Sequence, residues 1–407
     1  MTRNWPFVTD FDVGASQCAD ARIAHRLPLT AHPSVAAHVM RAIFESSRGG
    51  SVVSVSATPL ASPGAAMVEP TPSIDGGLDA VPGGNLSPAV PAPEVDRLVA
   101  GVEPASFRPI LARCLAGAVS PQVALMQMIC ESESAAAVRR AIDEVTARTD
   151  ADSRATDSIV RDRVDDLTRI LVDHEDGVDR IVDMLKSGVD SSAPARTVEE
   201  GLVFCERLFD WSVQQSEEAS VALYSLGSPE TLERATDEVV ALLADWGVLG
   251  RDRRVLQIGC WIGRFERALA PRVAEAHGVD ISAEMVRAAR RRCAGLANVH
   301  LEKSSGRDLA LYEAERFDLV YAVDTFPYLL QSGPTLVDRH FAEARRVLVP
   351  AGDFAIFNFS YRDDLDADRA DVERLAARHG FHLLVDGDRP FALWNGAVWR
   401  MKKAGKR

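Results

Sequence analysis

Two short segments of the sequence place glycine or an acid directly after a predicted strand. The apolar run Arg254 to Ile258 leads into Gly259-Cys260-Trp261-Ile262-Gly263, ahead of a helix rich in arginine and alanine. Glycine at such a turn lets the backbone approach a ligand closely, and the N-terminus of the following helix favours polar or anionic groups. About twenty residues later a second predicted strand ends at Asp280, where a doubly wound fold places a carboxylate that accepts hydrogen bonds from ribose hydroxyls. Together the two segments predict a nucleotide site.

A further predicted strand, Phe317 to Tyr321, is followed by polar residues that could do chemistry. In a parallel sheet, ligands lie outside the carboxyl ends of the strands. Asp324 is therefore the first candidate for a general base or an orienting group, and Tyr328 is the second. The alternative is that Asp324 caps the next helix and Tyr328 only packs. After the fifth predicted strand, Tyr361 and Arg362 could contact a substrate, although a structural turn explains them nearly as well.

Metal and disulfide chemistry find little support in the sequence. The six cysteines lie far apart and form no CxxC pair, which favours a reducing cytosol. Five histidines lie on predicted strands and helices without metal-ligand spacing, so packing and surface roles are expected for His277, His300, His340, His379 and His382. We therefore expect no metal site.

The elements that must position these residues form an α/β pattern. Residues 251 to 359 alternate β-branched runs with helical runs, which predicts a doubly wound, mostly parallel sheet. An aromatic-rich helical block over residues 198–250 precedes it, with Ser228-Pro229 as a helix start. We expect this block to cover the site, and residues 251–403 to form the domain that carries it.

The first half of the chain divides into three further segments. Residues 1–48 contain one plausible short helix, Ser34 to Ser46, and have no assigned role. Residues 49–94 are predicted to be a disordered linker, because the stretch 57–93 contains eight prolines and five glycines. Residues 95–190 show helical periodicity and predict an acidic helical module, for which a protein partner is one possibility.

Composition limits the classes of partner. The chain has 46 basic and 59 acidic side chains and a formal net charge of -13, which disfavours a polyanion such as nucleic acid. No window holds the roughly 18 uncharged apolar residues of a membrane span, and the N-terminus shows no signal peptide. We expect a cytoplasmic protein.

From about residue 200 to 403 the sequence resembles the class I S-adenosylmethionine-dependent methyltransferases, in a bacterial small-molecule branch. Gly278 to Met285 is similar to the second motif of that family. The landmarks that follow are similar to its third strand, its fourth strand, the helix end and turn before its fifth strand, and its last two strands: Asn298 to Lys303, Phe317 to Tyr321, Arg345 to Gly352, Gly380 to His382 and Leu393 to Met401. The resemblance implies a Rossmann-like sheet of seven strands whose last strand is antiparallel.

The resemblance also implies S-adenosylmethionine as the cofactor and a set of residues that bind it. In that family the acid, here Asp280, lies on the ribose, and Met285 lies near the adenine. The implied binding residues are Gln257, Gly259, Cys260, Gly263, Asp280, Ile281, Met285, Ser305, Gly306 and Val323.

Three positions depart from the family pattern. Gln257 and Ser305 stand where the family usually has acids, and each gives up a charge-assisted hydrogen bond. Trp261 replaces the middle glycine of GxGxG. Its indole could fill space meant for the methionine moiety or turn outward as a wall of the substrate pocket, and we expect the outward arrangement.

The resulting prediction is methyl transfer to an oxygen or nitrogen of a small molecule, aligned by the protein without a metal or covalent nucleophile. The alternative is a degenerate domain that serves as a scaffold, which would account for Gln257, Trp261 and Ser305 together. A nucleic-acid amino-methyltransferase is a minor alternative. It is suggested by a passing likeness of Thr325 to Tyr328 to an Asn-Pro-Pro-Tyr motif and disfavoured by the acidic charge.

Overall fold

The structure is a computed structural model, and it describes residues 92–132, 134–151, 156–186 and 197–405. The short helix expected at 34–46 and nearly all of the expected linker lie outside these residues. Among the described helices, none is long and apolar enough to cross a membrane.

The first described segment is helical, as its periodicity predicts. The helices are α2 (Ala92–Val99), α3 (Phe107–Leu115), α4 (Pro121–Ser132), α5 (Ala135–Ala151), α6 (Ser158–Asp173) and α7 (Glu175–Lys186). Helix α4 starts at the predicted Ser-Pro signal, where the Ser120 hydroxyl accepts a hydrogen bond of 3.2 Å from the backbone N–H of Val123. Helix α2 begins at Ala92, so the last three residues assigned to the linker are helical.

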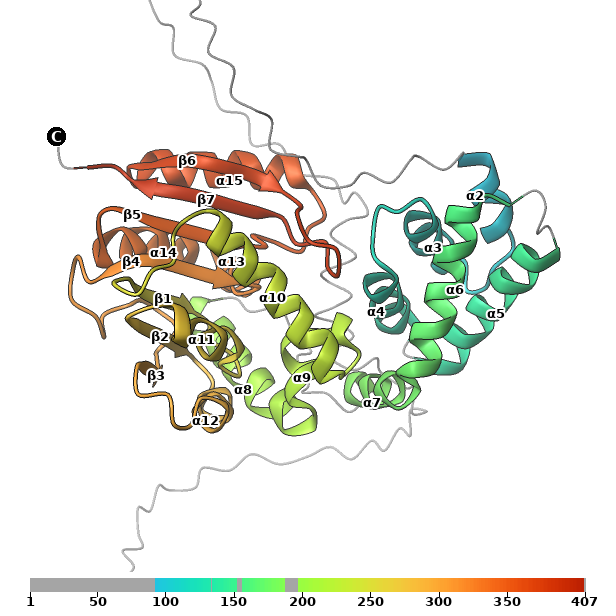
Figure 1. Cartoon of the computed structure of the whole chain (residues 1–407), viewed down its shortest axis with the longest axis horizontal. Coiled ribbons are helices and arrows are strands. Elements are labelled where there is room, and N and C mark those ends of the chain that lie inside the picture. Colours follow the sequence, from blue (N-terminus) through green and yellow to red (C-terminus); the bar gives the residue numbers. More distant parts are fainter. Residues whose placement is uncertain (1–91, 133, 152–155, 187–196, 406–407) are drawn as a thin grey trace, which may run out of the picture. The chain divides into compact units, whose positions relative to one another are not determined.

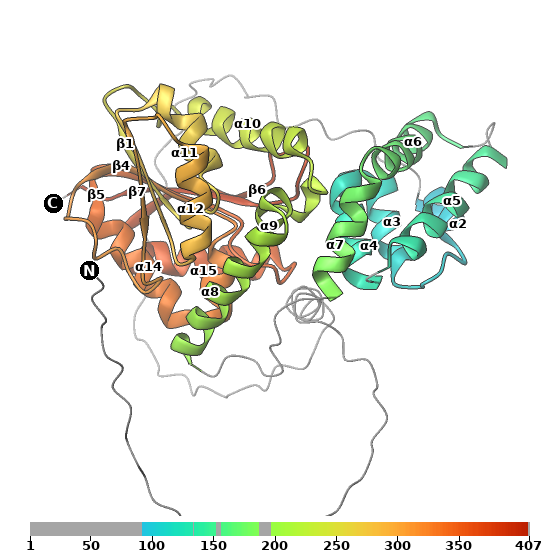
Figure 2. The same cartoon turned by 90° about the horizontal axis from the view of Figure 1, so that it is seen from below.

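The block before the sheet consists of α8 (Val198–Gln215), α9 (Glu217–Val221), the 3-10 turn η1 (Leu223–Ser225) and α10 (Pro229–Asp245). Thr197 caps α8 and Ser228 caps α10, each by accepting from a backbone N–H in the first turn. The stretch between α8 and α10 contains α9 and η1. Helix α8 packs against α12 and α13 of the following domain (Figures 1 and 2).

The sheet has seven strands in the order β3-β2-β1-β4-β5-β7-β6, with β1 to β5 parallel and β7 antiparallel to both β5 and β6. This confirms the predicted fold class. The elements are β1 (Arg254–Ile258), α11 (Arg264–Leu269), the 3-10 turn η2 (Ala270–Arg272), β2 (Glu275–Asp280), α12 (Ala283–Arg292), β3 (Val299–Lys303), β4 (Phe317–Val323), α13 (Phe326–Ser332), α14 (Pro334–Val347), β5 (Leu348–Phe357), α15 (Leu365–Arg378), β6 (Phe381–Asp388) and β7 (Val398–Lys403). The strand order reverses between β1 and β4, and such a switch point is where open α/β sheets bind ligands.

Alternate residues of the central strands supply two separate cores. Val255, Tyr321 and Phe357 belong to one buried cluster with Phe265 of α11. Their immediate neighbours along each strand, such as Leu256, belong to a second cluster with residues of α14 and α15. Because side chains alternate across a strand, the two clusters occupy opposite faces of the sheet. Both faces are covered, which holds the strand ends in place.

Two element boundaries differ from the sequence-based expectation. The helix end expected from Arg345 is present, because α14 ends at Val347, but the turn expected before the fifth strand lies within β5, which starts at Leu348. Strand β5 pairs with β4 at Leu348 and again from Asp353, and the irregular residues between these positions include Ala351 at φ 59°. The last strand begins at Val398 and not at Leu393.

Candidate functional site

Two cavities meet at the carboxyl ends of β1, β2 and β4. The first, the Asp280 cavity, has a volume of about 60 Å³ and is lined by α8, the turn after β1, the end of β2, the loop after β3 and α13. The second, the Asp324 cavity, is lined by residues that include Asp324, Asn358, Tyr361 and Trp394. Phe209, Trp261 and Tyr328 line both cavities.

Asp280 is the central polar residue of the first cavity. Its side chain is only 5% exposed, and the backbone N–H groups of Trp261 and Ser282 donate to its two carboxylate oxygens at 2.9 Å each. Burial raises the pKa of Asp280 to about 6, although these backbone donors favour the charged form. Each carboxylate oxygen can accept a second hydrogen bond, so Asp280 can hold a vicinal diol of the kind that ribose carries.

Two glycines allow the walls of the Asp280 cavity to pack closely against their neighbours. Gly259 has φ 73°, and a Cβ there would lie 2.2 Å from Oγ1 of Thr325. Gly306 has φ 71°, and a Cβ there would lie 2.8 Å from Ile281 and 2.9 Å from Leu202. Both positions need positive φ and have no room for a side chain.

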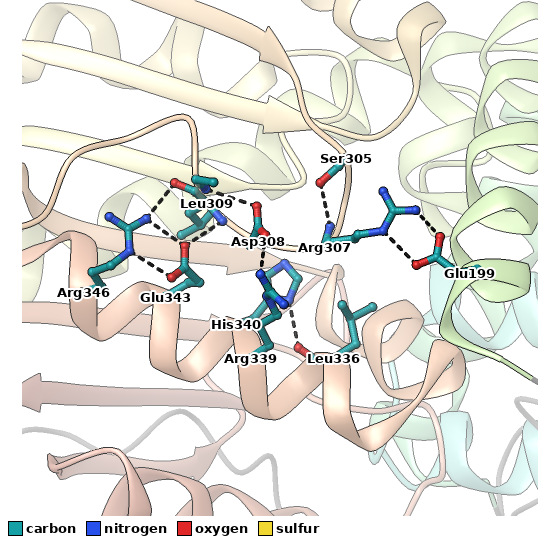
Figure 3. Close-up of polar contacts among 11 residues, drawn as sticks. Glu199, Ser305, Arg307, Asp308, Leu309, Leu336, Arg339, His340, Glu343 and Arg346 are labelled. Carbon is teal, nitrogen blue, oxygen red and sulfur yellow. Dashed lines mark hydrogen bonds and ion pairs between the residues drawn. The ribbon is translucent and has the colours of Figure 1, made fainter.

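The loop after β3 is fastened on two sides (Figure 3). Arg307 donates from Nε to Glu199 of α8 at 2.8 Å, and Arg339 of α14 pairs with Asp308 at 2.6 Å. Ser305 turns toward its own loop, where its hydroxyl accepts from the N–H of Arg307 at 3.2 Å. Its neighbours Ser304 and Gly306 line the cavity instead.

Helix α8 closes the Asp280 cavity from the opposite side. Asp210 accepts a hydrogen bond of 2.6 Å from the Ser282 hydroxyl and one of 3.1 Å from the Glu284 N–H, at the start of α12. Glu206 pairs with Lys303 at the end of β3 at 2.7 Å. With the Glu199–Arg307 pair, α8 is held at three points spaced along its length, and its inward face contributes Leu202, Cys205 and Phe209 to the cavity wall.

Trp261 lies where the two cavities meet. It has φ 51° and is 6% exposed, and its indole N–H donates to the carbonyl oxygen of Val323 at 3.0 Å. Its ring packs edge-on against Phe209, with centroids 4.7 Å apart. Trp261 lines the Asp324 cavity as well as the Asp280 cavity, so the expected outward arrangement stays a prediction.

Asp324 is held in an unusual backbone conformation. Its φ is 55°, and its N–H donates to the carbonyl oxygen of Phe357 at 2.9 Å. Its Oδ1 accepts from Nδ2 of Asn358 at 2.8 Å and from the Tyr361 hydroxyl at 3.4 Å. The residue does not cap α13, whose N-cap position is Thr325 and shows no side-chain cap. Asp324 therefore belongs to the cavity and not to the helix start.

The structure brings only part of the expected binding set together. Gly259, Asp280, Ile281, Gly306 and Tyr328 line the Asp280 cavity, and Asp324 lines its neighbour.

The other expected residues serve the surrounding structure. The Gln257 amide donates to the Gly259 carbonyl at 3.0 Å, and its oxygen accepts from the Tyr321 hydroxyl at 3.2 Å. Cys260 and Met285 are fully buried away from the cavity. Gly263 packs against Ala289 of α12, where a Cβ would lie 2.9 Å from that of Ala289, and the carbonyl of Val323 is occupied by Trp261.

Several lining residues were missed by sequence reasoning. The sequence places Phe209 in the aromatic-rich block over residues 198–250, and this aromatic content is the pattern that could have indicated a cavity wall. Trp394 lies in an irregular segment between β6 and β7. Its buried indole N–H has no hydrogen-bond partner among the described residues. No local pattern places such a segment beside the end of β4.

Three side chains at the start of β2 and β3 come within reach of a single ion. Glu275, His277 and His300 have ligand atoms within 4.8 Å of one another, because His277 and His300 are paired in register. Sequence spacing missed this group because it spans two strands. The Glu275 carboxylate already pairs with His277 at 2.8 Å and Arg316 at 3.5 Å, and the guanidinium there competes with a metal cation.

Residues 255–352 match a family described as "Methyltransferase domain". No curated protein matches the chain.

Solved structures with a similar fold include three methyltransferases of low sequence identity. Magnesium protoporphyrin IX methyltransferase from Synechocystis with bound S-adenosylmethionine is 15% identical, with a TM-score of 0.39 over 50% of this chain and 97% of that one. A phosphoethanolamine N-methyltransferase from Haemonchus contortus is 17% identical, with a TM-score of 0.41 over 52% and 50%. A putative sarcosine dimethylglycine methyltransferase from Galdieria sulphuraria is 18% identical, with a TM-score of 0.32 over 43% and 87%. At these values the likeness concerns the fold and not the acceptor.

Proposed function

Because residues 255–352 form a class I S-adenosylmethionine-dependent methyltransferase domain, we propose that the protein transfers a methyl group from that donor to a small molecule. The observation that carries the proposal is the placement of two carboxylates. Asp280 lies in one cavity and Asp324 in the next, with only Trp261, Phe209 and Tyr328 lining both. A donor held at the first and an acceptor held at the second would meet across these rings.

The nucleoside half of the donor suits the Asp280 cavity. Asp280 would accept hydrogen bonds from the ribose hydroxyls, and the adenine would lie between Ile281 and the Ser304–Gly306 loop. The cavity volume of about 60 Å³ is far below the roughly 300 Å³ or more of most ligand sites. Binding therefore requires α8 and the Trp261 indole to move apart from the strand ends.

The donor supplies an activated methyl group on a sulfonium, and the remaining work falls to residues of this chain. Helix α8 excludes water from the site, and Tyr328 and Phe209 align the acceptor against the donor. Asp324, at the end of β4, holds or accepts the proton of the nucleophile. None of these roles needs a metal.

A scaffold without methyl transfer is the second candidate, because one observation favours it. Trp261 fills part of the space where the methionine moiety would lie, and its indole N–H is fixed to the Val323 carbonyl. If this arrangement is permanent, the domain keeps its fold and does not bind the donor.

Isothermal titration with S-adenosylhomocysteine separates the two candidates. If the protein is a methyltransferase, S-adenosylhomocysteine should bind. Asp280→Ala should then weaken that binding by about 1.5 to 3 kcal/mol through loss of hydrogen bonds to a charged group. Asp366→Ala is the matched control, because Asp366 is an acid whose side chain is 94% exposed and that does not line the cavity. Absence of binding by a folded wild type at millimolar concentration supports the scaffold.

A further inference from the structure

Aromatic rings form one wall of the Asp324 cavity. The Tyr328 ring is the centre of three edge-on contacts, with centroids 4.9 Å from Phe209, 5.9 Å from Trp261 and 5.7 Å from Tyr361. All four residues line the cavity, and they come from α8, the turn after β1, α13 and the segment after β5. The faces of such rings carry partial negative charge and attract cations. The wall therefore favours a positively charged group over a neutral group of the same size.

The charged residues of the cavity act in the same direction. Asp324, Asp363, Asp364 and Asp368 line it, whereas Arg389 is the one cation among its described lining residues. Asp368 is paired with Arg362 at 2.7 Å and Asp363 with Arg113 at 3.4 Å, whereas no ion pair involving Asp324 or Asp364 occurs within the described part of the chain. The excess of carboxylates repels an acceptor that is itself a carboxylate or a phosphate.

Asp324 has a free acceptor atom in this cavity. Its Oδ1 receives hydrogen bonds from Asn358 and Tyr361, but its Oδ2 receives none from any described residue. The positive φ of Asp324 is held by the backbone hydrogen bond to Phe357, so the carboxylate position is fixed by the end of β5. A carboxylate that is held in this way and has one oxygen free can accept a hydrogen bond from a ligand.

We propose that the acceptor is a cationic amine whose ammonium group lies among these rings with an N–H donated to Oδ2 of Asp324. This inference rests on the proposed function and narrows its acceptor from an oxygen or nitrogen nucleophile to an amine. The carbon skeleton of the acceptor would pack against the aromatic wall.

The same arrangement can carry the proton. The O–H bond to Asp324 forms as an N–H bond of the ammonium breaks, and the electron pair stays on nitrogen. That pair then forms the N–C bond to the methyl carbon while the C–S bond of the sulfonium donor breaks and its pair goes to sulfur. Burial raises the pKa of Asp324 to about 6, although Asn358, Arg264 and Tyr361 favour the charged form, so the carboxyl is a stronger base than an ordinary aspartate.

Binding of simple probes tests the proposal without the donor. The full chain is titrated at neutral pH with three compounds of similar size, 2-phenylethylammonium, 2-phenylethanol and phenylacetate, with binding followed by calorimetry. The expected order is ammonium, then alcohol, then carboxylate, with the ammonium bound about ten-fold or more tighter than the alcohol. Equal binding of the alcohol or the carboxylate, or no binding of the ammonium at millimolar concentration, overturns the proposal.

Two variants show whether Asp324 causes the preference. Asp324→Asn should reduce the preference for ammonium over alcohol to about two-fold while the alcohol still binds, which also shows that the cavity remains folded. Asp366→Asn, which neutralises an exposed acid outside the cavity, should keep the wild-type order. A preference retained in Asp324→Asn contradicts the proposal. Failure of donor binding is recorded separately by titration with S-adenosylhomocysteine, so the proposed function and the proposed acceptor can fail independently.

Discussion

Buried polar or strained residues occur where β1 and β2 end and in the helix after β1. They are Trp261 in the turn after β1, Asp280 at the end of β2 and Glu266 in α11. The backbone N–H of Trp261 donates to Asp280, whereas the indole N–H of the same residue donates to the Val323 carbonyl. Removal of the indole should therefore change donor affinity without moving Asp280.

Trp261→Gly is expected to raise affinity for S-adenosylhomocysteine several-fold. The substitution clears the space beside β4 and also relieves a positive φ that costs a non-glycine residue roughly 1 to 2 kcal/mol. Trp261→Ala removes the ring but keeps the strained backbone, and it should give most of the same gain if the ring is the obstacle. Calorimetry on both variants measures this. A loss of affinity in both would mean that the indole supports the donor.

Glu266 gives a pH dependence of stability. It is fully buried in α11 with no hydrogen-bond partner for either carboxylate oxygen among the described residues, and burial raises its pKa to about 8. The folded state therefore keeps a proton that the unfolded state releases at its ordinary pKa of about 4.5, so the free energy of unfolding falls as pH rises between these two values. The total fall from this group is on the order of 5 kcal/mol.

Glu266→Gln should remove that part of the pH dependence. Glutamine is neutral at every pH and nearly the same size, and Gly278 leaves room for it, since a Cβ at Gly278 would lie 2.5 Å from Oε1 of Glu266. Denaturant unfolding between about pH 5 and pH 8 compares the variant with the wild type. The same slope in both proteins would show that Glu266 is not protonated in the folded state.

At the scale of elements, α8 controls access to the Asp280 cavity. Three of its polar attachments, through Asp210, Glu206 and Glu199, go to the start of α12, the end of β3 and the loop after β3. Asp210 accepts hydrogen bonds from the Ser282 hydroxyl and from the Glu284 N–H at the start of α12. A negative charge is favourable there because the N-terminus of a helix carries partial positive charge.

Asp210→Ala is expected to loosen α8. Loss of two hydrogen bonds to a carboxylate should lower the free energy of unfolding by about 1 to 3 kcal/mol and speed the release of bound S-adenosylhomocysteine. Glu233→Ala removes an exposed acid from α10 and serves as the control for losing a helical carboxylate. Stopped-flow displacement measures release. An unchanged release rate in a destabilised Asp210→Ala protein would mean that α8 does not gate the cavity.

The sequence predicted the strands well because β-branched runs, glycine turns and helix caps are local signals, as at Arg254–Ile258 and Ser228. It predicted the cavity less well because side-chain direction depends on pairing across the sheet. Gln257 and Ile258 are adjacent, but only Ile258 lines the Asp280 cavity, and Gln257 is turned to Tyr321 on the neighbouring strand. The contributions of Phe209 and Trp394 depend on tertiary packing, which no local window contains.

At the scale of the whole molecule, the proposed donor site belongs to a small part of the chain. Every residue that lines the Asp280 cavity falls between Leu202 and His340. Helices α8 and α14 both fasten the loop after β3 (Figure 3).

A chain that begins at residue 92 should therefore bind S-adenosylhomocysteine within about two-fold of the full-length affinity, because none of the lining residues is removed. Calorimetry on both proteins checks this, with circular dichroism to confirm that the shorter chain is folded. A large loss of affinity in a folded shorter chain would assign residues 1–91 a part in the donor site.

The most direct test of the account is a crystal structure of the protein grown with S-adenosylhomocysteine. The account predicts the ribose hydroxyls within hydrogen-bond distance of Asp280, the adenine beside Ile281 and Gly306, and the Trp261 indole displaced from the Val323 carbonyl. A ligand bound away from Asp280, or a site beneath α8 that stays closed at millimolar ligand, would contradict it.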